Sequence, residues 1–391
     1  MKFSILNIPQ YLNLNKVGLL EIVFALVPLL SGYGLGSLPL SVLIWVLLLV
    51  IVLIKGKIGH IRDFMAFKIF VIFWILHQIL IFAVDDVNLN GFLSTLLYFV
   101  AVFVLYPNLD MEKLKGSLNW VALISIIGLL YQWTDIMRGE MVHPLELPGL
   151  TMAESRLTTE SLRPSSFFME PASYVAFMCC PLLFALNDRK YIWATTIILS
   201  MFLTTSTTGL IVSFIMLGVS FLSGKKVRLS GIIPIIVIGV GLMYALTNWD
   251  VFDYGVNKLE TIDTETNVRL TQGPYVVSTM KPEEYIIGVP YSTSYRYCKD
   301  GRASDVAYYG DNVYMSTFWQ MLLLYGIIGL LLYLNVYFQI AKRCRQTLPL
   351  IAALTAVLFS SGYGTGIIYV FTLIVLLCIL YNNDNQLIKA Q

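Results

Sequence analysis

The chain has 391 residues, of which 57% are hydrophobic and only 13% are charged, and its mean hydropathy is +0.75. A soluble globular domain carries about 25% charged residues to cover its surface, so this composition excludes an ordinary soluble domain. The formal net charge of +2 is too small to indicate a nucleic-acid-binding protein.

The apolar residues fall into blocks long enough to cross a bilayer, which takes roughly 17–25 residues per helix. Residues 1–16 lack the pattern of a cleavable signal peptide, so the first block is expected to act as an anchor. We predict an all-α, polytopic integral membrane protein in which residues 1–391 form a single membrane domain with about twelve transmembrane helices. In chain order, the predicted spans are 17–34, 38–54, 64–84, 91–106, 118–134, 172–187, 191–205, 207–223, 229–247, 312–341, 348–361 and 366–381.

The basic residues indicate the orientation of these spans. Short loops on one side carry clusters of lysine and arginine, as at 225–228 and 342–345. The short turns on the other side, at 85–90, near 206 and at 362–366, carry none. Because positive charge is retained in the cytoplasm during insertion, we predict that both termini are cytoplasmic.

This orientation places two long loops outside the cytoplasm, at 135–171 and 248–311. Loops of this length are usually functional or disordered, and the aromatic residues of the second loop argue against disorder. The second loop has ten acidic and six basic residues, a net charge of −4, so it is not a broad surface for polyanions. An anion would instead be held by individual arginines, whose rigid fork of donors suits phosphate oxygens. The candidates are Arg163 and Arg269.

Arg163 lies seven residues before Glu170, which directly precedes Pro171 and the next apolar span. Proline is well tolerated in the first turn of a helix, and a carboxylate there faces the positive helix end. Glu170 is therefore either a helix cap or a functional carboxylate at the membrane boundary. Arg163 is either a salt-bridged loop residue or part of an anion site, and Phe167 and Phe168 are expected to pack at the interface.

The histidines and cysteines are scattered along the chain. No group of them has metal-ligand spacing, so we expect no protein-bound metal. The chain also lacks a P-loop and a glycine-rich dinucleotide motif, so we expect no cofactor.

Four segments follow one another in an informative order. They are R-P-S-S-F-F-M-E-P-A-S-Y (163–174), T-T-S-T-T-G (204–209), N-V-R-L (267–270) with Y-I-I-G-V-P-Y (285–291), and D-N-V-Y-M (311–315) with L-Y-G-I-I-G-L-L (324–331). In order, spacing and side of the membrane, this pattern resembles the Wzy-type polymerases of bacterial O-antigen and capsule repeat units. The resemblance covers about 160 to 335, and the hydropathy profile agrees over the whole chain.

The resemblance implies a GT-C-like, multi-pass protein of the bacterial inner (plasma) membrane, with 135–171 as its first periplasmic loop and 248–311 as the large one. It implies an inverting, metal-independent glycosyltransferase that joins undecaprenyl-pyrophosphate-linked glycan donors and acceptors at the periplasmic face. Membrane lipid and a chain-length regulator protein are the further partners that it implies, with no role for nucleic acid.

The resemblance also suggests roles for individual residues. Arg163 and Arg269 would grip pyrophosphate, and Glu170 would deprotonate the acceptor hydroxyl or hold Arg163 in place, with Asp311 as a weaker candidate for the base. The predicted catalytic residues are thus Glu170, Arg163, Arg269 and Asp311, and the predicted substrate-binding residues are Arg163, Arg269, Asn312, Tyr291, Tyr295 and Arg296.

Three alternatives remain open. A flippase for lipid-linked oligosaccharides would have a similar number of spans, although ionisable residues in the predicted spans are few, Glu21 being the clearest. An O-antigen ligase shares the layout, but ligases generally place a histidine where the large loop re-enters the membrane, and 248–311 contains none. The third alternative is a structural membrane subunit without chemistry.

Overall fold

The computed structural model describes residues 13–36, 38–55, 64–85, 89–152, 163–223, 268–303, 306–309, 312–360 and 366–390. The description of Arg269 and Asn312 is confined to the backbone. The predicted span 229–247 and Asp311 lie outside the described residues. Within these limits the structure is mostly helical, as the sequence predicts.

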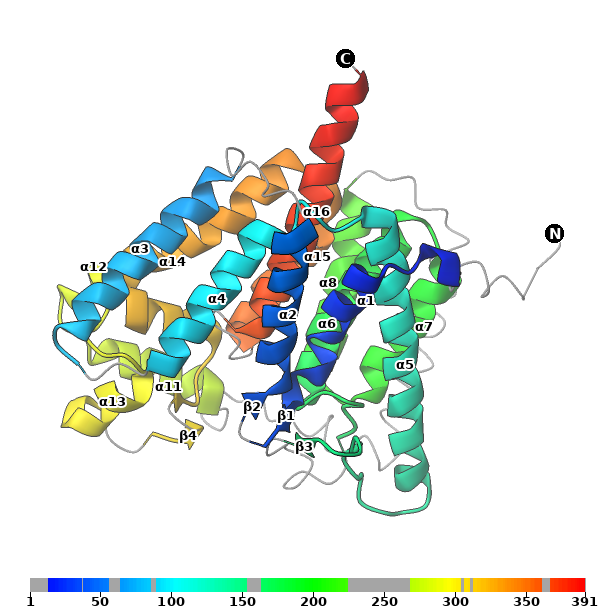
Figure 1. Cartoon of the computed structure of the whole chain (residues 1–391). Helices are drawn as coiled ribbons and strands as arrows, with labels where there is room; N and C mark the ends of the chain where they lie inside the picture. The colour runs from blue at the N-terminus through cyan, green and yellow to red at the C-terminus, as the bar shows by residue number, and fades with distance from the viewer. Residues whose placement is uncertain are drawn as a thin grey trace.

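Apolar helices of different lengths stand side by side and run alternately up and down, forming a bundle (Figure 1). Their sequences are runs of leucine, isoleucine, valine and phenylalanine, which satisfy every backbone group locally when helical and so suit an apolar surrounding. They are α1 (Leu19–Leu26), α2 (Leu40–Lys55), α3 (Met65–Phe82), α4 (Leu89–Leu105), α5 (Met111–Met137), α6 (Pro171–Asn187), α7 (Tyr191–Leu203), α8 (Thr207–Leu222), α14 (Thr317–Arg343), α15 (Leu348–Ser360) and α16 (Ile367–Ala390).

Four of the described helices are long and apolar enough to cross a membrane: α3, α5, α14 and the 367–384 part of α16. Their neighbours are shorter apolar helices. On α2, Leu43, Val46, Leu47 and Val50 form an exposed stripe at helical spacing. Apolar stripes of this length face lipid in a membrane protein, whereas soluble monomers seldom expose them. The chain is therefore a membrane-associated protein.

The first predicted span, 17–34, is not one helix. Helix α1 ends at Leu26, and Pro28 precedes a single 3-10 turn (Leu29–Gly32) and strand β1 (Tyr33–Leu35). Val27 and Pro28 keep helical dihedrals, but proline has no backbone N–H to donate, and the chain tightens into the 3-10 turn, so the α-helix ends after eight residues. A helix of this length extends only about 12 Å, which is too short to cross a bilayer.

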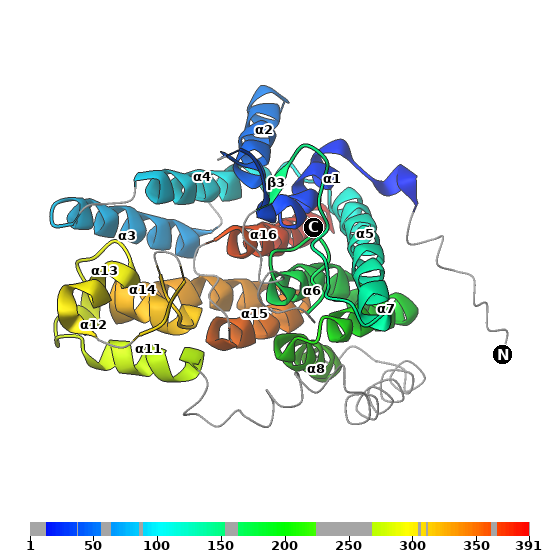
Figure 2. The ribbon, with the colours of Figure 1, turned by 90° about the horizontal axis from the view of Figure 1, so that it is seen from below.

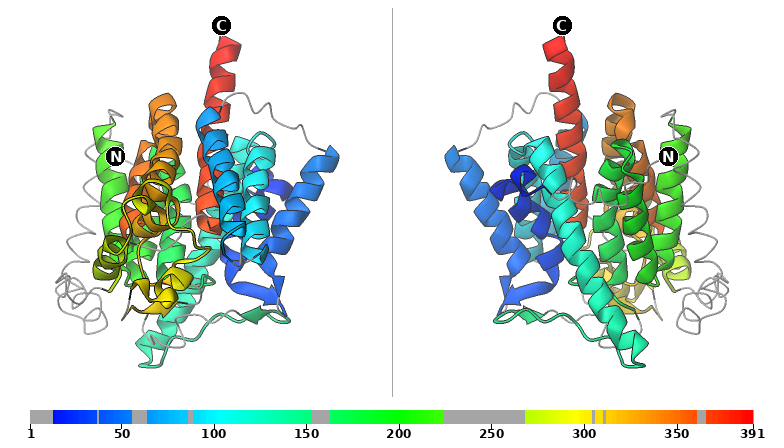
Figure 3. Two further views of the ribbon diagram at one scale, coloured as in Figure 1. Left: turned by 90° about the vertical axis from the view of Figure 1, so that its left-hand side faces the viewer. Right: turned by 90° about the vertical axis from the view of Figure 1, so that its right-hand side faces the viewer.

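The short elements gather at one end of the bundle, which we call the loop end (Figure 1). Strand β1 pairs with β2 (Leu38–Pro39) and with β3 (Thr151–Met152), so the chain that follows α5 crosses this end to reach the N-terminal strands (Figure 3). The remaining short elements here are α11 (Val268–Ser278), α12 (Glu284–Ile287), α13 (Ser294–Tyr297), β4 (Tyr308–Tyr309) and β5 (Asn312–Val313). The described parts of both long predicted loops thus lie at the same end.

The opposite end carries ion pairs around the short connection between α6 and α7, which contacts the start of α5. Lys115 lies 3.5 Å from Asp188, and Lys190 lies 3.6 Å from the same carboxylate. The C-terminal part of α16 extends beyond this end (Figure 1). Basic residues that the sequence places in the cytoplasm are therefore found at the end away from the two long loops.

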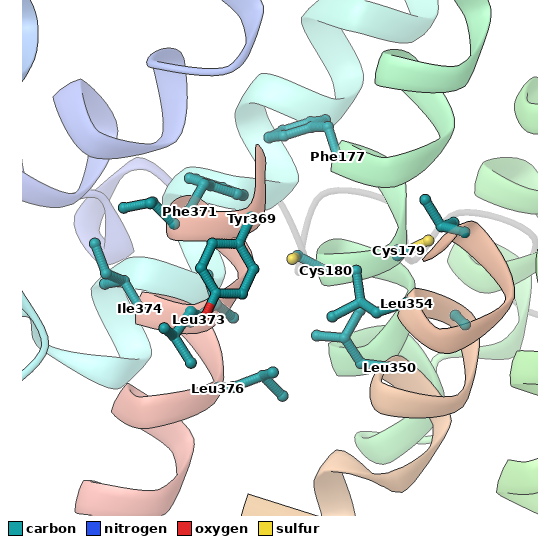
Figure 4. Packing of buried hydrophobic residues seen from close by; sticks show 14 of the residues in the cluster. Phe177, Cys179, Cys180, Leu350, Leu354, Tyr369, Phe371, Leu373, Ile374 and Leu376 are labelled. Atoms are coloured by element: carbon teal, nitrogen blue, oxygen red, sulfur yellow. The ribbon is translucent and has the colours of Figure 1, made fainter. Parts of the chain in front are cut away.

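The core of the bundle is apolar and aromatic. Side chains from α6, α15 and α16 meet there, including Phe177, Cys180, Leu354 and Phe371 (Figure 4). All five cysteines are buried free thiols, and Cys179 with Cys180 fills space inside α6, as the sequence predicts. Cysteine behaves as a small apolar residue in such positions.

Helix α14 is interrupted at Gly326, where the backbone adopts φ 62° and ψ −171°. The interruption lies opposite α12 and the turn that follows it. The N–H of Val289 donates to the carbonyl of Leu323 (2.9 Å), a group that the break would otherwise leave without a partner in its helix. The broken helix is therefore completed by a segment of the large predicted loop.

Candidate functional site

The predicted site residues fall into two groups at the loop end. Arg163 and Glu170 lie at the start of α6, whereas Tyr291, Tyr295 and Arg296 lie at α13. Seen from the loop end (Figure 2), α11, α12 and α13 lie beside α3 and α14, and α14 and α15 lie between them and α6. We call the two groups the α6 cluster (Gln132, Arg163, Ser166 and Glu170) and the α13 cluster (Asp85, Ser292, Tyr295 and Arg296).

Helix α5 fixes the segment that leads into α6. The side-chain carbonyl of Gln132 accepts hydrogen bonds from the N–H groups of Ser165 (3.0 Å) and Ser166 (2.7 Å). One turn earlier, a Cβ at Gly128 would lie 2.6 Å from the hydroxyl of Ser166 and 2.8 Å from the ring of Phe167, so this glycine lets the segment pack closely on α5. Phe168 is fully buried against Tyr174 rather than lying at an interface. The segment before α6 is therefore held by α5 through Gln132 and by α6 through Tyr174.

Arg163 and Glu170 occupy the two ends of this held segment. Arg163 is only 9% exposed, which is unusual for an arginine and excludes a freely solvated side chain. Glu170 is half-buried at the N-cap position of α6, and Pro171 follows it at the start of the helix, as predicted. Its side chain makes no capping hydrogen bond to α6, so the capping interpretation of Glu170 is wrong for the side chain.

Helix α8 begins close to α6. A Cβ at Gly209 would lie 3.2 Å from Val175 on α6 and 2.7 Å from the carbonyl of Met201 on α7, so this glycine permits the close approach of the helices. The N-cap residue, Ser206, makes no side-chain capping bond. The indole N–H of Trp133, next to Gln132 on α5, donates to the carbonyl of Leu203 (2.8 Å) and holds the turn before α8.

The starts of α6 and α8 therefore lie at the same end of the bundle without side-chain caps. In α6, Pro171 has no N–H and the N–H of Ser173 is donated to the carbonyl of Glu170 (3.0 Å), so Ala172 supplies the remaining first-turn donor. Helix N-termini carry partial positive charge and are suited to phosphate. Ser166 and Thr205, in the two preceding segments, adopt positive φ of 57° and 53°. Both hydroxyls are buried and find no hydrogen-bond partner among the described residues. Strained residues of this kind are concentrated at functional sites.

Replacing Gln132 by leucine is expected to lower the free energy of unfolding by roughly 2–6 kcal/mol, because two buried N–H groups lose their acceptor at about 1–3 kcal/mol each. The change would be measured by denaturation in detergent micelles, together with protease sensitivity of 138–170. Gln78→Leu on α3 is the matched control for a buried glutamine away from this segment. Equal effects of the two changes would contradict the anchoring role of Gln132.

The α13 cluster is organised by Asp85, at the end of α3. Its carboxylate accepts from the N–H and the hydroxyl of Ser292 (2.8 Å each) and from the guanidinium of Arg296. The ring of Tyr295 packs edge-on against Tyr308, with Lys299 above it. Arg296 and Tyr295 thus have structural contacts within the protein, and their role in substrate binding remains a prediction. Tyr291 similarly packs on Tyr297, with ring centroids 5.6 Å apart.

The contacts of Asp85 with Ser292 and Arg296, which we call the Asp85 clamp, are expected to fail only in acid. Burial acts to raise the pKa of Asp85, but the hydrogen bonds from Ser292 and Arg296 outweigh it and hold the pKa below its usual value. A depressed carboxyl pKa stabilises the fold above the unfolded value of about 4, and the stabilisation is lost as pH falls through the folded value. The midpoint of thermal unfolding should therefore be insensitive to this clamp between about pH 5 and 8 and fall below about pH 4.

Asp85→Asn should remove the contribution of the clamp to the fall of the unfolding midpoint in acid. It should also lower the midpoint at pH 7. Glu112→Gln, at the opposite end, is the control, because the pKa of Glu112 is also lowered but its side chain is 62% exposed. An exposed ion pair contributes little, so the effect of the control should be small. An unchanged pH profile for Asp85→Asn would show that the clamp does not contribute to stability.

The remaining predicted residues are placed only in part. The backbone of Arg269 lies in the first turn of α11, which packs on α14 where a Cβ at Gly273 would touch Trp319. Asn312 pairs with Tyr309 in the β4–β5 ladder, and Asp311 lies outside the described residues. Convergence of Arg269 with Arg163 therefore stays a prediction.

Sequence reasoning missed Gln132, Ser166, Thr205 and Asp85. Gln132 carried one available signal, since it is a polar residue within the predicted span 118–134. Its partners lie some thirty residues away, and no local pattern indicates them. Among the described residues, no group of three or more His, Cys, Asp or Glu could hold a metal ion. The chain matches no family model, and no curated protein or solved structure was found to be similar to it.

Proposed function

We propose that the chain is a membrane glycosyltransferase that polymerises undecaprenyl-pyrophosphate-linked oligosaccharide repeat units into O-antigen, capsule or exopolysaccharide. The observation that supports it most is the α6 cluster. A buried arginine, a half-buried glutamate and two helix N-termini without side-chain caps lie at one end of an apolar bundle. This is a setting for a pyrophosphate whose lipid chain remains in the membrane.

The proposal includes the full topology, with about twelve spans in the bacterial inner membrane, both termini cytoplasmic and the loop end periplasmic. Two features support it. The described parts of 135–171 and 248–311 share one end, and the ion-paired basic connections share the other. A lipid-linked donor reaches such a site laterally from the bilayer, and a chain-length regulator would contact it within the same membrane.

The reaction is a substitution at the anomeric carbon of the donor sugar. The acceptor hydroxyl oxygen forms the new bond as the bond from carbon to the pyrophosphate oxygen breaks, and the electron pair leaves with pyrophosphate. Arg163 and Arg269 stabilise that departing charge, and Glu170 takes the acceptor proton. Asp311 is the alternative base, and the sugar contacts fall to Asn312, Tyr291, Tyr295 and Arg296. Displacement from the opposite face inverts the anomeric configuration and needs no metal.

One observation favours the flippase as a second candidate. Transporters often contain interrupted helices, and α14 is interrupted at Gly326. Glu21 gives this candidate less support, because its carboxylate accepts a hydrogen bond from the N–H of Asp110 (2.9 Å) at the start of α5. That bond is a fixed structural contact between two helices, unlike the alternately accessible carboxylate that ion-coupled transport requires.

The test is reconstitution of the purified protein with lipid-linked repeat units in vesicles that contain a chelator. A polymerase is expected to yield a ladder of lengthened lipid-linked products. Single units moved across the bilayer without lengthening would identify a flippase. Transfer to a different lipid acceptor without lengthening would identify a ligase, and either result would overturn the proposal.

A further inference from the structure

The segment between α11 and α13 has an uncharged centre and charged ends. Residues 285–291 (Y-I-I-G-V-P-Y) contain no ionisable acid or base other than the two terminal tyrosines. Just before them, the buried carboxylate of Glu284 pairs with Arg302 (3.2 Å). Just after them, Ser292 is held by Asp85, which also pairs with Arg296. Charged anchors therefore flank a short apolar segment, 285–291, which comprises the end of α12 (285–287) and the residues that follow it (288–291); we call this whole segment the turn.

This turn enters the break in α14. A Cβ at Gly288 would lie 2.2 Å from the carbonyl oxygen of Leu324, and a Cβ at Gly326 would lie 2.4 Å from that of Ile286. The two backbones are thus in direct contact. Gly326 is nine residues into α14, or about 13 Å along the helix axis from Thr317. Half the hydrocarbon thickness of a bilayer is about 15 Å. The distance from the start of α14 to the contact is therefore comparable to the depth of one leaflet.

Helix α3 contacts the same region. His77 packs edge-on against Tyr325 (5.2 Å), and the indole N–H of Trp74 donates to the hydroxyl of Tyr325 (3.2 Å). The backbone nitrogen of Tyr325 lies only 2.7 Å from the position of a Cβ at Gly288, so the same tyrosine contacts the turn. Since α3 is one of the helices that can cross a membrane, the turn lies alongside a membrane-spanning segment, inside its length.

The outward side of the turn is apolar and exposed. Ile286 and Ile287 are 53% and 51% exposed. On the adjoining faces, Leu80 of α3 is 64% exposed and Ile327 of α14 is 49% exposed. The turn therefore continues the apolar outer surfaces of the two helices between which it lies. Tyrosine at each end of the turn suits the membrane–water interface.

We propose that residues 285–291 form a re-entrant tip that inserts into the bilayer from the loop end, with Ile286 and Ile287 in contact with lipid acyl chains. The large loop is then not wholly extramembrane, because its centre is anchored in one leaflet. Non-helical backbone is tolerated at membrane depth where protein satisfies its polar groups, as Leu323 does for Val289. This tip is independent of whether the chain polymerises glycans.

Spin labels at single cysteines test the tip in reconstituted vesicles. Ile286→Cys and Ile287→Cys would each carry a nitroxide, and its collisions with oxygen, which concentrates in lipid, would be compared with those with a polar nickel chelate. Both positions are expected to favour oxygen several-fold more than Lys299→Cys, in the exposed segment after α13. Leu80→Cys on α3 gives the value for a lipid-facing site.

The five native cysteines are buried, so the unsubstituted protein, taken through labelling, supplies the background. Because Ile286 and Ile287 are half-exposed, cysteine at either position leaves the packing of the turn intact, and the two positions check each other. Nickel accessibility at 286 and 287 equal to that at 299 would overturn the proposal, whatever the outcome of the polymerisation assay.

Discussion

Gly326→Ala is expected to destabilise the protein by at least about 3 kcal/mol, seen as a large fall in the unfolding midpoint in detergent. The dihedrals of Gly326 lie in a region that only glycine occupies readily, at a cost of about 1–3 kcal/mol for any other residue. The added Cβ would also meet the carbonyl of Ile286 at 2.4 Å and the nitrogen of Gly288 at 2.5 Å. Both neighbours are backbone atoms, so relief requires the turn to leave the break in α14. Gly288 has φ 92° and ψ 174°, so Gly288→Ala should lower the unfolding midpoint to a similar extent.

Two other glycines separate the conformational cost of the substitution from the steric clash of the added Cβ. Gly301 also has positive φ (81°) but has open space around its Cβ position, so Gly301→Ala should show only the smaller conformational cost. Gly218, inside α8, has open space and helical geometry, so alanine there should be neutral or stabilising by up to about 1 kcal/mol. If Gly326→Ala unfolds at the same midpoint as Gly218→Ala, the close contact between α12 and α14 does not exist.

Arg163→Gln is expected to reduce polymerisation by roughly 10²–10³-fold, the typical loss when one positioned donor to a developing negative charge is removed. Lysine at the same position keeps the charge but not the planar fork, so Arg163→Lys should retain more activity than Arg163→Gln without reaching the unsubstituted level. The measurement is the rate of ladder growth in vesicles at saturating and at low concentrations of lipid-linked units.

Arg138→Gln is the matched control, because Arg138 lies at the end of α5 on the same side of the bundle and is exposed. It should leave the rate unchanged. Since Arg163 is buried, the unfolding midpoint of each variant must be measured alongside the rate. A folded Arg163→Gln protein with full activity would remove Arg163 from the proposed site.

Much of the bundle follows from hydropathy alone. The predicted spans 172–187, 191–205, 207–223 and 348–361 agree with α6, α7, α8 and α15 to within two residues at each end. Local signals set these boundaries, since apolar runs stop at polar pairs such as Asp188–Arg189 or at the Ser/Thr-rich turn before α8. The run 17–34 fails as a single span because Pro28 interrupts an otherwise apolar sequence, and its effect outweighs mean hydropathy.

The candidate site is less accessible to such reasoning. Pro171 at the start of α6 is a local signal, and it placed Glu170 correctly at the helix boundary. The burial of Arg163, the anchoring by Gln132 and the clamp at Asp85 depend on residues far apart in sequence. The break at Gly326 is equally a tertiary feature, because glycine within an apolar run is compatible with a continuous helix until another backbone needs the space.

The interruption of α14 also constrains the order in which the protein is assembled. The turn at 285–291 is synthesised before α14, yet its docking position is formed by α14 together with α3. Without α14, backbone groups of this turn such as the N–H of Val289 would lack a hydrogen-bond partner in lipid, which disfavours its entry into the bilayer. The turn must therefore wait at the aqueous surface until α14 has emerged from the ribosome and entered the membrane. Docking of this turn would then be a late step in biogenesis, after the surrounding helices have been threaded.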